Sequence, residues 1–172
     1  LHPESGEHLS EASLRRLAQW KPRRHDFDTV LVLSDGLNAR ALKQGEQLAM
    51  LVSGLRDGLA EHGFRLAEQP IIVESGRVRV GYRIGEQLFG KRAGVGQVLH
   101  VVGERPGTGH NTLSVYLTRA STSRWAEAGT IDHDSTKVVS SIAETALDPA
   151  LGAAQVVRLL AGAIAPGSQS SS

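Results

Sequence analysis

The chain has 172 residues, the size of one domain, and can bury a core without metal ions or disulfide bonds. Its 19 lysines and arginines nearly balance 18 aspartates and glutamates, so nucleic acid is not an expected partner, and the lack of cysteine excludes a thiolate metal site or a cysteine nucleophile. No apolar run approaches the roughly 20 residues that span a bilayer, and residues 1–5 lack signal-peptide features, so we expect a cytoplasmic protein without a membrane partner.

The N-terminal part predicts one helix and one strand. Ser10 is a suitable N-cap, and apolar residues follow at helical spacing until Lys-Pro-Arg-Arg at residues 21–24 ends the pattern. The continuous apolar run at residues 29–33 is typical of a strand that is buried on both faces. We therefore expect residues 1–27 to form a short helix and a linker.

The middle of the chain predicts alternating helices and strands. Helical spacing from Asn38 to Gly63 favours one long helix, with Asn38 as its N-cap and Gly63 as its end. Residues 70–73 and the alternating residues 77–80 favour two short strands that turn at residues 75–76. A short helix at residues 84–89 and a buried strand at residues 97–102 follow.

The C-terminal part predicts a further strand at residues 113–118 and a helix at residues 137–147. Asp148 is expected to cap a last helix that runs to about residue 164, with Pro149 in its first turn. The recurring strand, helix, strand order predicts an α/β fold: a Rossmann-like three-layer sandwich with a mostly parallel sheet over residues 28–165. Residues 166–172 are expected to be a disordered tail.

Two loops are candidates for a ligand site. Ser-Asp-Gly at residues 34–36 and Glu-Arg-Pro-Gly at residues 104–107 each follow a buried strand, and parallel strands would bring both to one sheet edge. We expect a shared crevice there. Two plainer interpretations stay open: Ser34 and Asp35 only cap the following helix, and Glu104 only pairs with a neighbouring arginine.

Other motifs give weaker signals. Residues 85–92 match the spacing of a phosphate-binding loop, but Arg92 replaces the Ser or Thr that would bind Mg²⁺ and the run is expected to be helical. A stand-alone module that binds a small phosphorylated ligand is the alternative function. The seven histidines lack paired ligand spacing, so we expect no protein metal site. Asp-His-Asp at residues 132–134 indicates either a proton shuttle or a solvated loop.

The ordered motifs resemble the small (light) subunit of ethanolamine ammonia-lyase. The similarity runs from about Thr29 to about Ala143. It is carried by residues 33–39, 75–78, 84–86, 101–107, 114–118 and 139–142. The resemblance implies a Rossmann-like domain that lies against the large subunit in a hetero-oligomer, with adenosylcobalamin between the two. A scaffold whose loops only contact another chain is a further alternative.

The resemblance also implies three cofactor-binding residues. These are Val78, Glu104 and Val138, although familiar members carry cysteine at the position of Val138. The family's cobalt ligand is the cofactor's own base, and the Asp-x-His-x-x-Gly motif of other cobalamin proteins is absent, so His133 is not an expected ligand. The implied reaction is radical conversion of ethanolamine to acetaldehyde and ammonia, with no catalytic residue on this chain. The family also leaves open a location inside a bacterial microcompartment.

Overall fold

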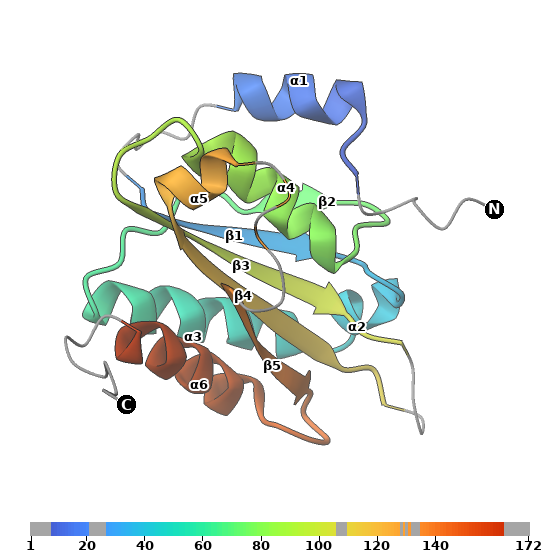
Figure 1. Ribbon diagram of the computed structural model, residues 1–172. Helices are drawn as coiled ribbons and strands as arrows, with labels where there is room; N and C mark the ends of the chain where they lie inside the picture. Colours follow the sequence, from blue (N-terminus) through green and yellow to red (C-terminus); the bar gives the residue numbers. More distant parts are fainter. Residues whose placement is uncertain are drawn as a thin grey trace, which may run out of the picture.

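Figure 1 presents a computed structural model of the chain, in which helices lie on both faces of one five-stranded sheet. It describes residues 8–20, 27–105, 110–127, 129, 131 and 135–163. The strands are β1 (Thr29–Ser34), β2 (Ile71–Val73), β3 (Val95–Gly103), β4 (Leu113–Ser121) and β5 (Thr136–Ile142). The helices are α1 (Glu11–Gln19), α2 (Ala39–Lys43), α3 (Gln47–Glu61), α4 (Val78–Phe89), α5 (Thr122–Ala126) and α6 (Pro149–Gly162). Within this described part, no helix is long and apolar enough to cross a membrane.

The sheet is mixed, with two parallel and two antiparallel pairings, so the expectation of a mostly parallel sheet is not confirmed. The strand order is β2-β1-β3-β4-β5; β1 is parallel to β2 and β3, whereas β4 is antiparallel to both β3 and β5. A parallel crossover needs a dozen or more residues, and the connection from β3 to β4 at residues 104–112 is too short. The α/β class is confirmed, but β4 runs opposite to the other four strands, which the strands of a Rossmann-like sheet do not do.

Two secondary-structure predictions were wrong, one because of long-range strand pairing and one because the sequence pattern was too short. The helix expected at residues 137–147 is β5, which pairs with β4 and buries Val139 and Ile142 against the core. The strand expected at residues 77–80 is the first turn of α4. An alternating pattern of only four residues is too short to distinguish a strand from a helix. Over the full length of α4, Val80, Ile84 and Phe89 lie buried on its inner side.

The expected long helix from Asn38 is two helices, α2 and α3. Gly45 lies between them with a positive φ of 54°, a conformation that glycine adopts without strain and that ends α2. The predicted caps are confirmed: side chains of Ser10, Asn38 and Asp148 accept hydrogen bonds from the first turns of α1, α2 and α6. The strands at residues 29–33, 97–102 and 113–118 are confirmed as parts of β1, β3 and β4, and the strand at residues 70–73 is confirmed as β2, which begins one residue later.

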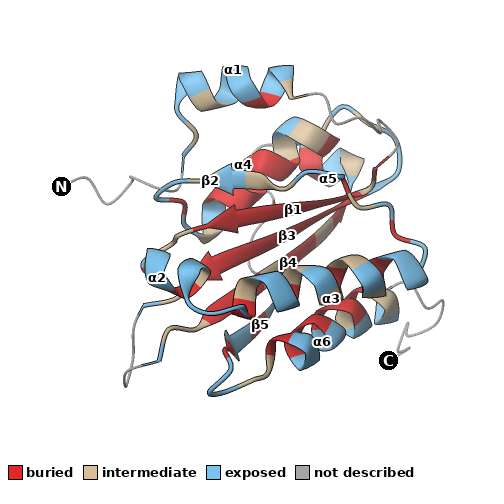
Figure 2. Ribbon diagram, turned by 180° about the vertical axis from the view of Figure 1, so that it is seen from behind, coloured by how far each residue is buried: buried red, intermediate tan, exposed pale blue. Residues whose placement is uncertain are grey.

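The core consists of two apolar clusters, one on each face of the sheet. Residues along β1 alternate between them: Leu31 and Leu33 pack toward α3 and α6, whereas Val30 and Val32 pack toward α4. Figure 2 shows the central strands buried and the outer surfaces of α3 and α6 exposed. The helix α1 lies outside α4, and it buries Leu17 in the second cluster. This packing leaves the ends of the strands as the sites where loops from distant segments meet.

Candidate functional site at the carboxyl edge of the sheet

The loops after β1 and β3 lie at the same edge of the sheet, as the sequence predicted. Ser34 is in register with Val102, and the backbone N–H of Leu37 donates a 3.0 Å hydrogen bond to the carbonyl of Gly103. A Cβ atom at Gly103 would lie 2.7 Å from the carbonyl oxygen of Asp35. The two loops therefore form one continuous wall, and only glycine fits where their backbones meet.

Ser34 has an interior role, so its interpretation as a cap for the following helix was wrong. Its Oγ donates to the carbonyl of Gly76 at 3.1 Å and lies 2.8 Å from Nε2 of His100. The cap of α2 is instead Asn38, whose Oδ1 accepts a hydrogen bond from the N–H of Arg40 at 3.2 Å. Ser34 thus attaches the turn before α4 to the end of β1.

His100 is enclosed between the sheet and α4. Burial lowers the pKa of His100 to about 4, an effect that the backbone of Val78 partly offsets. The ring is therefore neutral near pH 7, and its close neighbours are Ser34 and Gly81. A serine and a histidine this deeply buried cannot reach a substrate, so we assign the pair a structural role: it positions the start of α4.

Glu104 is held by an aromatic neighbour. The Oη of Tyr116 donates a 3.1 Å hydrogen bond to Oε1 of Glu104, and the backbone N–H of Glu104 donates to the carbonyl of Thr112 at 3.0 Å. Burial, followed by the charge and hydrogen bond of Glu104, raises the pKa of Tyr116 to about 12. Among the described residues, Oε2 of Glu104 has no hydrogen-bond partner. Glu104 therefore presents one oxygen at this edge that can accept a further hydrogen bond.

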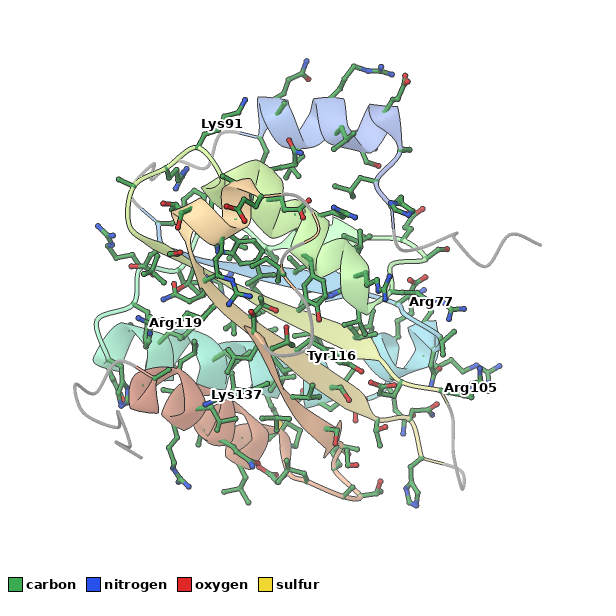
Figure 3. All side chains as sticks on the ribbon, in the orientation of Figure 1. Arg77, Lys91, Arg105, Tyr116, Arg119 and Lys137 are labelled. Atoms are coloured by element: carbon green, nitrogen blue, oxygen red, sulfur yellow. The ribbon has the colours of Figure 1, made fainter. Side chains whose placement is uncertain are left out.

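Val138 lies next to this pair in the sheet. Tyr116 is in register with Val138 on one side and with His100 on the other, so the three side chains project from the same face. Val138 is 47% exposed on the edge strand β5. In Figure 3, Tyr116 lies over the sheet below α4, and the labelled Arg77 and Arg105 lie at the carboxyl edge.

Val78 begins α4 on this same side of the sheet. One turn later, Oη of Tyr82 accepts a 3.2 Å hydrogen bond from Thr136, the first residue of β5. This contact joins α4 to the strand that carries Val138. The structure therefore places all three expected cofactor-binding residues on the α4 side of the sheet: Val78 on the helix, Glu104 at the end of β3 and Val138 on β5.

Tyr116 and Tyr82 were not predicted as site residues. Tyr116 lies inside the strand predicted at residues 113–118, whereas Tyr82 falls between two predicted elements, and the hydroxyl of a buried tyrosine needs a partner. Their partners, Glu104 and Thr136, could be found only from the antiparallel pairing of β3, β4 and β5.

The competing motifs do not form sites. Residues 85–89 continue α4, and Gly85 packs against the ring of Trp125, so this run has no phosphate-binding loop geometry. No group of three or more histidine, aspartate or glutamate side chains that could hold a metal ion occurs within the described ranges. The Asp-His-Asp run at residues 132–134 lies outside the described residues.

Fold and site together define an α/β domain with a polar face at the carboxyl edge of a mixed sheet. A family model described as Ethanolamine ammonia-lyase light chain (EutC) matches residues 1–169. The chain belongs to this family.

Curated relatives agree with this assignment. A protein of Pseudomonas paraeruginosa, named ethanolamine ammonia-lyase small subunit, is 38% identical over 120 residues, which are 69% of this chain and 41% of that protein. A protein with the same name from Ralstonia nicotianae is 38% identical over 95 residues, which are 54% of this chain. Another from Azotobacter vinelandii is 34% identical over 121 residues, which are 69% of this chain. The chain spans 32% to 42% of the length of these relatives.

Proposed function

We propose that this chain forms the light-chain wall of an adenosylcobalamin site in an ethanolamine ammonia-lyase. Its partner in the hetero-oligomer is a large subunit, which binds the substrate, and the assembly works in the cytoplasm or within a bacterial microcompartment there. Two things support the proposal: membership of the light-chain family, and the arrangement of Val78, Glu104 and Val138 on one side of the sheet. The observation that carries it is the Glu104 carboxylate, which Tyr116 holds by one oxygen only.

The chemistry of these side chains fits the cofactor. A corrin ring is rimmed by amide groups, and a carboxylate such as that of Glu104 accepts hydrogen bonds from amide N–H donors. The N-cap of α4, Arg77, makes no side-chain hydrogen bond to the first turn, so the backbone N–H of Val78 itself is the donor that this helix start would offer. Exposed apolar surface at Val138 suits van der Waals contact with the ring edge.

Each residue then has a defined task. When bound, adenosylcobalamin supplies an organic radical through cleavage of its cobalt–carbon bond. Glu104 orients the amide rim, and the start of α4 fixes one side of the ring. Val138 and Leu37, which is 44% exposed beside the Gly103 contact, exclude water where the large subunit closes over the site. No residue of this chain is assigned as a cobalt ligand or as a catalytic group.

A change at Glu104 tests this proposal. Glu104→Gln keeps the shape of the side chain but removes the charge that strengthens its hydrogen bonds, so adenosylcobalamin should bind about tenfold more weakly. The measurement is a spectroscopic titration of the full chain assembled with its large subunit. Glu61→Gln, an exposed position at the end of α3, removes the same charge away from the site and should leave the affinity unchanged.

The scaffold alternative predicts the opposite result. If the loop after β3 only contacts another chain, Glu104→Ala leaves the cofactor affinity of the assembled complex unchanged. Unchanged affinity in both Glu104 variants, in a complex that does bind adenosylcobalamin, would therefore contradict the proposal.

A further inference from the structure

A second concave site lies at the opposite edge of the sheet. It is a cavity of about 320 Å³ where the start of β1, the start of β3 and the last residues of β4 meet the segment after α3. Three arginines, Arg65, Arg92 and Arg119, line it together with one aspartate, Asp28. Figure 3 places Arg119 at the end of the sheet away from Arg77 and Arg105. This site is therefore separate from the Glu104 face.

The single acid is already paired. Oδ2 of Asp28 accepts a 3.1 Å hydrogen bond from Nε of Arg65, and Oδ1 accepts from the backbone N–H of Arg65 at 3.1 Å and from the hydroxyl of Thr29 at 2.7 Å. Both oxygens of the carboxylate are therefore used. The charges of Arg92 and Arg119 have no counter-ion among the side chains that line the cavity.

Arg92 and Arg119 are both partly removed from water. Nη1 of Arg92 donates to the carbonyl of Phe27 at 3.1 Å, and its guanidinium lies 4.0 Å from the centre of the Phe27 ring. Nη1 of Arg119 is buried and has no hydrogen-bond partner within the described part of the chain. A buried guanidinium nitrogen without an acceptor is unfavourable, and an oxyanion in the cavity would supply that acceptor.

We propose that this cavity binds a small molecule that carries a carboxylate or phosphate group. Arg119 and Arg92 donate hydrogen bonds to the oxyanion, since the planar guanidinium group matches the geometry of a carboxylate and of a phosphate. The rings of Phe27, Phe64 and Phe89 form the apolar part of the lining. The volume is at the small end of the range for ligand pockets, about 300 to 1,000 Å³, so the ligand is a small metabolite and not a nucleotide.

Calorimetric titration of the full chain at constant ionic strength tests the site, with inorganic phosphate and succinate as separate probes. Binding of phosphate alone assigns a phosphate ligand, and binding of succinate alone assigns a carboxylate ligand. Arg119→Gln should lower the affinity for the anion at least tenfold. Arg119→Lys should lower this affinity less, because the positive charge remains. Arg158→Gln, an exposed position on α6, removes the same charge and should change the affinity less than twofold.

The stability of the variants provides a second readout. Without added anion, Arg119→Gln should unfold at the same temperature as the parent chain or higher, because it removes a buried group with no acceptor. Three results would overturn the proposal: no binding of either probe, equal binding by the parent chain and Arg119→Gln, or an equal loss in Arg158→Gln.

Discussion

At the scale of single residues, Tyr116 connects the parts of the proposed cofactor face. It donates to Glu104 and lies in register with Val138 and His100. Tyr116→Phe keeps the ring and removes the donor, so the free energy of unfolding should fall by about 1 kcal/mol and cofactor affinity should fall several-fold because Glu104 loses its anchor. Denaturant unfolding and titration of the assembled complex measure the two effects.

A double-mutant cycle isolates this interaction. If Tyr116 acts through the Glu104 carboxylate, the affinity losses of Tyr116→Phe and Glu104→Gln should combine to less than their sum. Fully additive losses would mean that the two residues contribute independently, and the positioning role of Tyr116 would be wrong.

His100 makes stability depend on pH. Its folded-state pKa of about 4 lies below the ordinary value of 6.5, so the unfolded chain binds the proton more tightly. The stabilisation is complete above pH 6.5 and is lost as pH falls toward 4, and this group alone accounts for up to about 3 kcal/mol of the free energy of unfolding. Urea unfolding at several pH values gives the free energy of unfolding as a function of pH. Between pH 6.5 and 4, this free energy should change less with pH in His100→Gln than in the parent chain. His62→Gln, at the exposed end of α3, should keep the pH dependence of the parent chain. An unchanged slope in the His100 variant would contradict the assignment.

At the scale of elements, the contact between the loops after β1 and β3 positions Glu104. Gly103→Ala places a Cβ against the backbone of Asp35 and Asn38, which cannot move without moving the start of α2. We expect a loss of about 2 kcal/mol in the free energy of unfolding. Gly162→Ala is the matched control, because a Cβ there meets no atom within 4 Å. Equal stabilities of the two variants would show that the contact is unimportant.

Among the elements, local features could be predicted from the sequence, and features that depend on distant segments could not. Caps such as Asn38 and Asp148 are local, since a side chain satisfies N–H groups two or three residues away, and they were predicted correctly. The direction of β4 and the strand identity of β5 depend on pairing between distant segments, and both predictions failed. The shared edge of the two loops was predicted because β1 and β3 are parallel, whereas the link between Tyr116 and Glu104 needed the antiparallel partner.

At the scale of the whole molecule, the two edges of the sheet have different chemistry. The carboxyl edge presents a carboxylate acceptor, the start of α4 without a side-chain cap, and exposed apolar surface, which suits the proposed cofactor. The opposite edge presents a small cavity in which Arg92 and Arg119 have no counter-ion among the lining side chains, which suits the proposed anion. On our two proposals, this chain binds a ligand at each edge and contributes no catalytic residue to the reaction.

Reconstitution with the large subunit tests the central claim most directly. Ethanolamine deamination is measured for the chain alone, for a large subunit alone and for their mixture, each with adenosylcobalamin. Our account predicts turnover only in the mixture. Turnover by the chain alone, or no turnover in a mixture with a competent large subunit, would contradict it.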